Sequence, residues 1–201
     1  MKKFSATGFT IVELLVTVSM IAIVLAVGVP AVNTTIRNSV LTAGINEFVA
    51  ALNFARGESI KRGVNVTVRK TSSMTCTSTT CTCTTTSTVG YEGGWQVFTD
   101  ANADGCEDPT TDSVLRVHES LKTLYTLWGN SSVKNYISYQ PDGTSQNFGS
   151  FALCDGTQAL TSTAARGLVV NTLGRATMAT VDSNGILQNS SGTEFNSCAS
   201  P

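Results

Sequence analysis

An uncharged apolar run near the N-terminus constrains this chain most. Residues Leu14–Val32 carry no charged side chain, and the apolar pattern reaches back to Phe9. About 20 such residues form a helix long enough to cross the hydrocarbon core of a bilayer, which is about 30 Å thick. Lys2 and Lys3 precede the run, and the first charge after it is Arg37. Since positive charge stays inside, the sequence predicts one span with a cytoplasmic N-terminus and the remainder of the chain on the outer side.

The acidic residue at the front of this run argues against an ordinary secretory signal peptide. Glu13 interrupts the apolar segment, where a signal peptide would tolerate no carboxylate, and no small-residue cleavage site follows the run. An acid inside the bilayer costs on the order of 3 kcal/mol, so we expect the Glu13 carboxylate to have a partner.

The N-terminal segment resembles a known type of leader. Residues 2–15 read KKFSATGFTIVELL and are similar to the leader of type IV pilins and type II secretion pseudopilins. The resemblance implies that a prepilin peptidase cuts after Gly8 and methylates the new N-terminal amine of Phe9. It also implies that Glu13 pairs with the N-terminal amine of a neighbouring subunit during assembly, which supplies the expected partner.

The apolar run continues into an amphipathic helix. Pro30 removes one backbone hydrogen bond, so we expect either a kink or local melting there, or an end of the span at this residue. Beyond it, apolar residues recur at helical spacing on one face that should lie on a sheet: Ile45, Phe48, Val49, Leu52 and Ala55. Gly63 follows two basic residues and is placed to end the helix. The sequence therefore predicts one helix from Phe9 to about Arg62.

Strands are predicted for most of the remaining chain. Alternation begins at Val64, and turn signals separate several further candidates: Trp95–Thr99, Val114–His118, Tyr136–Tyr139, Ser150–Cys154, Gly167–Asn171 and Arg175–Val181. Residues 71–88 consist almost entirely of Thr, Ser and Cys, and we expect an exposed hairpin or irregular loop there, stapled by cysteines. The prediction is an α+β, pilin-like fold in which a long helix, half transmembrane and half amphipathic, packs on antiparallel sheets.

These patterns divide the chain into four parts. We expect a leader at 1–8, a transmembrane segment at 9–32, an amphipathic helix half at 33–63 and a periplasmic β-rich head at 64–201. Only 13% of residues are charged and the net charge is -1, so bulk electrostatics predicts no nucleic-acid partner. His118 is the single histidine, and the sequence has no nucleophile motif such as G-x-S-x-G with which it could form a catalytic site. We expect no enzyme, no cofactor and no small-molecule substrate.

The even number of cysteines favours disulfides in an exported chain. Metal binding is disfavoured, since Cys81 and Cys83 lack C-x-x-C spacing and His118 has no companion histidine.

The remainder of the chain resembles the GspH/FimT family of pilin-like proteins. Five segments carry the resemblance: Asn46–Gly63, Gly94–Gly105, Val114–Val117, Ser150–Cys154 and Gly174-Arg175, with Cys198 near the end. It implies a disulfide between Cys154 and Cys198. With that bond set, we favour Cys76 paired with Cys81 or Cys83, and Cys106 paired with the other. The resemblance further implies a minor pilin of the FimU/FimT type that primes a type IV pilus. Its partners would be other minor and major pilins. The subunit would lie first in the bacterial inner membrane and then in the fibre. The alternative is a GspH-type minor pseudopilin of a type II secretion system.

Two sharper possibilities are set against simpler ones. Some FimT-like minor pilins bind DNA for natural transformation through a Gly-Arg-x-Arg motif, which makes DNA binding through Arg175 a second alternative function. Thr177 stands here in place of the second arginine, and one arginine offers roughly one phosphate contact, so the sequence disfavours this alternative. Asp100, Asn102 and Asp104 resemble the start of a calcium loop, and with Asp108 they could also form a calcium site of another type. The expected bidentate glutamate is absent, and turn chemistry explains the same residues, so we favour a turn over a metal site.

Overall fold

The structure is a computed structural model that describes residues 8–77, 81–84, 88–121, 124–157, 159–188, 195, 197 and 198. Lys2 and Lys3 of the predicted leader lie outside these residues. The chain divides into two compact units, an N-terminal unit of residues 1–39 and a folded unit of residues 40–201. One helix, α1 (Ile11–Arg62), contributes to both, and each unit is described by itself.

In the N-terminal unit, α1 exposes its apolar side chains all round. From Phe9 to Ile36 every large apolar residue is exposed, and the most apolar stretch of the helix has a mean hydropathy of 2.6. By length and composition this segment can cross a membrane. The helix continues through Pro30, so the local melting considered for this position is wrong.

In the folded unit, α1 presents one buried face and ends as the sequence predicts. The buried residues recur every three or four positions: Leu41, Gly44, Ile45, Phe48, Ala51, Leu52, Ala55 and Ser59. Gly63 has a φ of 69°, and its N–H donates to the carbonyl of Ser59 at 2.9 Å. Only glycine adopts this left-handed conformation without a steric cost, which places the end of the helix here.

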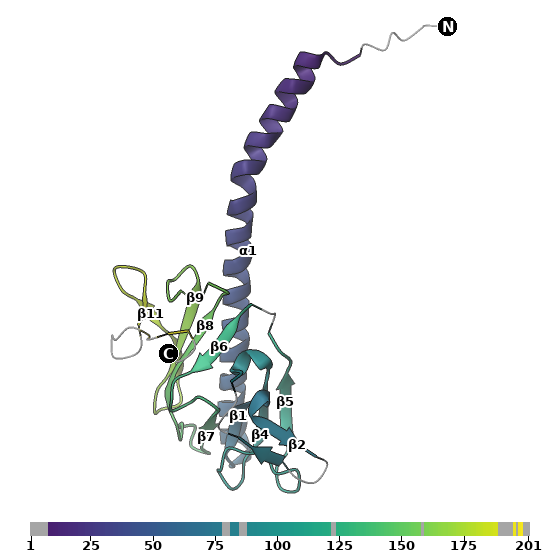
Figure 1. Ribbon diagram of the computed structural model, residues 1–201. Coiled ribbons are helices and arrows are strands. Elements are labelled where there is room, and N and C mark those ends of the chain that lie inside the picture. Colours follow the sequence, from purple (N-terminus) through teal and green to yellow (C-terminus); the bar gives the residue numbers. More distant parts are fainter. Residues whose placement is uncertain are drawn as a thin grey trace. The chain divides into compact units, whose positions relative to one another are not determined.

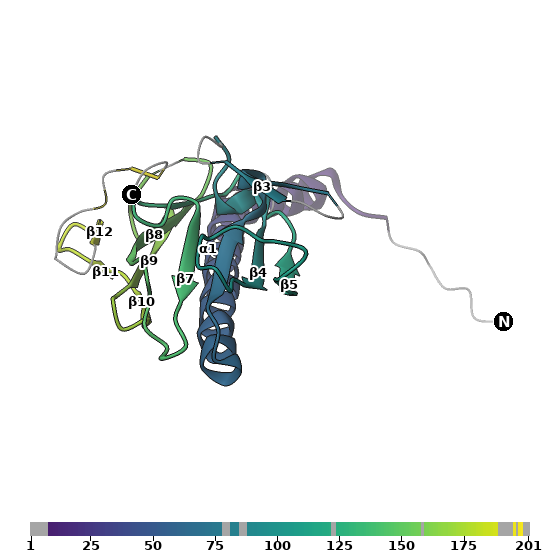
Figure 2. The same cartoon turned by 90° about the horizontal axis from the view of Figure 1, so that it is seen from below.

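Two antiparallel four-stranded sheets pack around this face of α1. The first has the order β5-β4-β1-β7, with β5 at Val114–His118, β4 at Trp95–Thr99, β1 at Val66–Lys70 and β7 at Tyr136–Tyr139. The second has the order β10-β9-β8-β6, with β10 at Ala176–Met178, β9 at Ala165–Val170, β8 at Gly149–Cys154 and β6 at Thr126–Gly129. Strands β4 and β5 lie on one side of α1 and β8 and β9 on the other (Figure 1 and Figure 2).

Smaller elements complete the folded unit. Two short hairpins pair β2 (Met74–Cys76) with β3 (Cys81–Cys83) and β11 (Thr180–Val181) with β12 (Leu187–Gln188). Two 3-10 turns flank the β2–β3 hairpin in the chain: η1 (Thr71–Ser73) follows β1, and η2 (Tyr91–Gly93) precedes β4. The predicted α+β arrangement of a long helix on antiparallel sheets is confirmed.

An aromatic cluster joins the helix to both sheets. The ring of Phe48 on α1 lies edge-on to Trp95 of β4 and to Phe151 of β8, with centroids 5.1 and 4.9 Å apart. Tyr91 of η2 contacts the same ring at 5.2 Å. All four side chains are fully buried, so one helical residue holds the two sheets together at the centre of the core.

Candidate functional site

The expected cleavage bond lies just before α1. Gly8, Phe9 and Thr10 have no regular secondary structure, and the Phe9 side chain is 79% exposed. A peptide bond must leave helical geometry and be accessible before a peptidase can bind it. The Gly8–Phe9 bond meets both conditions, and cleavage there stays a prediction.

Thr10 caps the start of α1. Its Oγ1 accepts a hydrogen bond from the Glu13 N–H at 3.2 Å, and its carbonyl accepts one from the Leu14 N–H at 3.2 Å. This is the threonine half of a T-x-x-E capping box. Sequence reasoning assigned no role to Thr10, although the Thr10–Glu13 spacing was the signal that could have shown it.

Glu13 is placed to accept a cation. It lies in the first turn of α1, where the helix dipole favours negative charge, and its side chain is exposed. Within the described residues its carboxylate has no ion pair or hydrogen bond. Cap and assembly roles are compatible, because the cap uses the backbone N–H of Glu13 and leaves the carboxylate available.

All six cysteines form disulfides in the structure. Cys154 of β8 is bonded to Cys198, 44 positions along the chain. The pairs left open by the sequence are resolved as Cys76 with Cys81 and Cys83 with Cys106. Among the described residues, the one group of three potential metal ligands is Cys76, Cys81 and Glu107. Two of its three sulfur or oxygen donors are tied up in a disulfide and offer no thiolate to a metal.

The loop considered for calcium uses its carboxylates to close a turn. Asp100 is fully buried, and its Oδ2 accepts hydrogen bonds from Thr67 Oγ1 at 2.6 Å and from the Gly105 N–H at 3.0 Å. Its Oδ1 accepts one from the Asp104 N–H at 3.2 Å. Asn102 Nδ2 donates to Asp104 Oδ2 at 2.9 Å. Burial raises the pKa of the Asp100 carboxyl, against the opposing effect of the hydrogen bonds from Thr67 and Gly105.

The Gly-Arg pair considered for DNA has a structural reason for its glycine. Gly174 has a φ of 72°, and a Cβ at this position would lie 2.3 Å from the carbonyl oxygen of Gly143. The Arg175 side chain is exposed, and its backbone N–H donates to Asn171 Oδ1 at 2.9 Å. The glycine is therefore needed for the close approach of two turns, whatever Arg175 binds.

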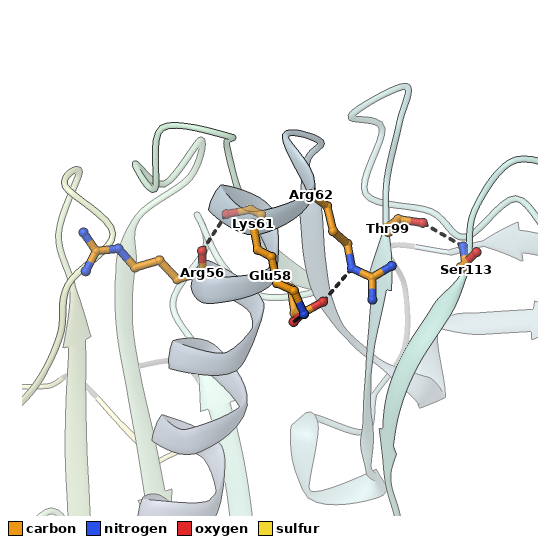
Figure 3. A network of polar contacts seen from close by, with 7 residues as sticks. Arg56, Glu58, Lys61, Arg62, Thr99 and Ser113 are labelled. Carbon is orange, nitrogen blue, oxygen red and sulfur yellow. Dashed lines mark hydrogen bonds and ion pairs between the residues drawn. The ribbon is translucent and has the colours of Figure 1, made fainter.

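The basic end of α1 is partly neutralised. Glu58 contacts Arg62 at 2.5 Å and Lys61 at 3.4 Å, and the hydrogen bond from Arg62 holds the pKa of Glu58 below its ordinary value. The Arg56 side chain points away from this group (Figure 3). Its Nε donates to the Gly143 carbonyl at 2.8 Å. Three of the cations at this end thus have partners within the chain, which does not favour a phosphate-binding surface.

A groove opens beside the first turns of α1 in the folded unit. Its volume is about 260 Å³, and its lining comes from α1, from β5 and the loop after it, and from β8: Val40, Ala43, Gly44, Glu47, His118, Ser120, Leu121, Tyr125 and Leu153. The walls are mostly apolar, and the charged residue is Glu47, beside His118.

His118 is held by three contacts at the edge of this groove. Its ring stacks on Trp95 at 3.8 Å, its Nδ1 lies 2.7 Å from the Glu119 carbonyl oxygen, and its Nε2 lies 3.2 Å from Glu47 Oε2. Both oxygen partners are acceptors, and a neutral imidazole has one N–H. Both contacts are hydrogen bonds at once only when His118 is protonated.

Comparison with known proteins decides the family. The family model for GspH, described as type II transport protein GspH, matches residues 44–174, which is more than half of the chain. The chain belongs to the GspH family.

Two solved structures have the same fold as this chain. Two crystal structures of the type IV minor pilin FimU from Pseudomonas aeruginosa, in space groups P21 and P65, superpose with TM-scores of 0.53 and 0.52. They are 17% and 18% identical to this chain, and each match covers 79% of this chain and 94% or 99% of FimU. At this identity the likeness establishes the fold. A comparison with curated proteins found no match.

The GspH match begins inside the site just described. It covers the part of α1 from Gly44 onward, the groove residues after it and the turn at Gly174. The segment from Gly8 to Glu13 and the cysteine at position 198 lie outside the matched range. The GspH match therefore accounts for most of the folded unit, while the roles expected of Gly8, Phe9 and Glu13 rest on the N-terminal sequence alone.

Proposed function

We propose that this GspH-family chain is a minor pilin, a structural subunit that helps to prime a type IV pilus. In this proposal a prepilin peptidase cuts the precursor between Gly8 and Phe9 and methylates Phe9. The apolar part of α1 anchors the subunit in the inner membrane, with the folded unit in the periplasm. The mature subunit then enters a fibre with other minor and major pilins.

The observation that carries the proposal is the fully exposed apolar segment of α1. Apolar surface in water costs roughly 25 cal/mol per Å², so a helix with no buried side chain from Phe9 to Ile36 needs lipid or other helices around it. In a membrane-anchored subunit, lipid surrounds this helix before assembly, and the helices of neighbouring subunits surround it afterwards. A GspH-family fold follows this helix in the chain. The combination supports the role of a fibre subunit over that of a soluble enzyme or a soluble binding module.

Glu13 supports assembly in particular. An exposed carboxylate on an otherwise apolar helical stretch is costly in a bilayer unless a cation meets it. The free amine that cleavage would create on Phe9 of a neighbouring subunit is such a cation. Pairing of the two would favour assembled subunits over isolated ones in the membrane.

A minor pseudopilin of a type II secretion system is the second candidate. The description of the matching family as a type II transport protein favours it. Both candidates use the same anchor, helix and folded unit, and they differ in the machine that the subunit enters.

One experiment tests the proposal and separates the candidates. The gene is deleted in the producing bacterium and complemented with the wild type, Glu13→Ala or Glu13→Gln. We expect loss of surface pili on deletion, recovery with the wild type, and little recovery with either variant, although both should be inserted and cleaved. Loss of secreted enzymes with normal pili would favour the pseudopilin instead. Normal piliation and secretion after deletion would contradict both.

A further inference from the structure

We infer that the groove beside α1 receives the helical segment around Ile36 and Arg37 of a second copy of this chain. This inference rests on the proposed role as a fibre subunit. The contact specifies the surface of one subunit and the segment of the next that bind each other. The groove is defined by Val40, Gly44, Glu47, His118, Leu121 and Tyr125.

The size of the groove fits a side chain better than a small molecule. Its volume of about 260 Å³ lies below the roughly 300–1,000 Å³ of small-molecule pockets. On the helical side, Gly44 lets Leu153 pack closely on α1, since an added Cβ would lie 3.1 Å from Leu153 Cδ2. Val40, Leu121 and Tyr125 supply apolar surface on either side. A branched apolar side chain can enter this recess.

At the polar end of the groove, one carboxylate oxygen of Glu47 is available as a hydrogen-bond acceptor. The Glu47 side chain is 55% exposed, and its Oε2 contacts His118 Nε2. Its Oε1 has no hydrogen-bond partner among the described residues. A cation arriving with the apolar side chain could therefore bind Oε1 without displacing His118.

The chain itself carries a segment with the matching chemistry. Arg37 is the one charged residue between Glu13 and Glu47, and it follows Ile36, whose side chain is 55% exposed. Within the described part of the chain, Arg37 has no ion pair. An exposed branched side chain next to an unpaired cation is complementary to an apolar recess next to a carboxylate.

The contact would also propagate. Arg37 and Glu47 are ten positions apart in the sequence, so this pair joins different parts of the two copies. The surfaces that meet are different on the two copies, which makes the contact heterologous. A heterologous contact that does not close into a ring extends into a filament.

Charge reversal in full-length protein tests the inference. A photo-reactive phenylalanine analogue replaces Leu121, and cross-links are mapped in membranes of the producing bacterium. We expect a cross-link between Leu121 of one copy and the residues 32–37 segment of another. Glu47→Lys or Arg37→Glu alone should lower its yield about fivefold, and the double variant Arg37→Glu/Glu47→Lys should restore it. Glu119→Lys, a matched charge change on the neighbouring loop, should leave the yield unchanged.

Several results would overturn the inference. A cross-link that forms only with another protein would show a different occupant. If neither single charge reversal lowers the cross-link yield, Arg37 and Glu47 do not contact each other. The same conclusion follows if the yield of the double variant stays as low as the yields of the single variants. Fibre incorporation measured in the same cells keeps this separate from the proposed function. Incorporation without dependence on Arg37 and Glu47 rejects the groove contact alone, while absence of the wild type from all fibres rejects the subunit role.

Discussion

Phe48 shows how a single side chain can fix the arrangement of the folded unit. It stands on α1, and its ring touches one aromatic residue from each four-stranded sheet. The sequence placed Phe48 on the buried face by helical spacing alone. Its particular partners, Trp95 and Phe151, are 47 or more positions away in the chain and follow from the pairing of the sheets, which no local pattern encodes.

Removing the Phe48 ring should destabilise the folded unit severely. Phe48→Ala leaves a cavity between both sheets, and substitutions of this kind cost about 3–5 kcal/mol in free energy of unfolding. Urea unfolding of the full-length protein in detergent, followed by tryptophan fluorescence, measures the change. Phe148→Ala is the control, because Phe148 is 53% exposed and should lose less than about 1 kcal/mol. Equal losses in the two variants would show that Phe48 does not hold the core together.

Asp100 should make stability depend on pH in a direction unusual for a carboxylate. Burial raises its pKa in the folded state, so the folded state binds its proton more tightly than the unfolded state. The free energy of unfolding contributed by Asp100 is therefore fully present below its ordinary pKa of 3.8 and is lost as pH rises through the raised value. Wild-type protein should gain stability relative to Asp100→Asn as the pH is lowered from neutral into this window.

A second carboxylate provides a control of opposite sign. Asp142 is exposed, and the hydrogen bond from the Thr144 side chain lowers its pKa, so its contribution is present above the ordinary pKa and fades as pH falls. Urea unfolding across the acidic range should show opposite slopes for the wild type compared with Asp100→Asn and with Asp142→Asn. A flat difference for Asp100→Asn would contradict the role of burial.

At the scale of elements, periodicity predicted what local patterns control. Strands β4, β5 and β7 begin and end at the predicted residues, because alternation and turn signals bound each of them. β6 was missed, since Thr126–Gly129 is short and ends in glycine, and it is a strand only because it pairs with β8. The Thr-rich stretch contains the β2–β3 hairpin. The Cys76–Cys81 disulfide joins two directly paired residues of this hairpin, and the Cys83–Cys106 disulfide ties it to the loop after β4.

The N-terminal cap of α1 is an element-scale feature with its own test. Thr10→Ala removes the acceptor of the Glu13 N–H, and losing such a cap costs about 1 kcal/mol, or roughly a fivefold change in local opening. Hydrogen exchange at the Glu13 and Leu14 amides should accelerate accordingly in micelles, while Thr10→Ser should retain most of the protection. Thr17→Ala is the matched control within the helix, where the hydroxyl donates to the Leu14 carbonyl instead. Unchanged exchange in Thr10→Ala would contradict the cap.

At the scale of the whole molecule, two kinds of surface set what the chain can do. The N-terminal unit exposes an apolar helix that water disfavours, and the folded unit is closed by a core and three disulfides. The sequence predicted both, because an uncharged run and an even cysteine count are visible without coordinates. The groove beside α1 was not predictable, since His118, Leu121 and Leu153 reach Glu47 only through the folding of separate strands.

The central claim is that this chain becomes a processed, membrane-anchored fibre subunit. Mass spectrometry of the N-terminal peptide, from membranes and from sheared fibres of the producing bacterium, tests it most directly. The account predicts that the peptide begins at methylated Phe9 in both fractions. A soluble mature protein that begins after residue 28 would contradict the account, because the apolar helix would then have been removed as an ordinary signal peptide.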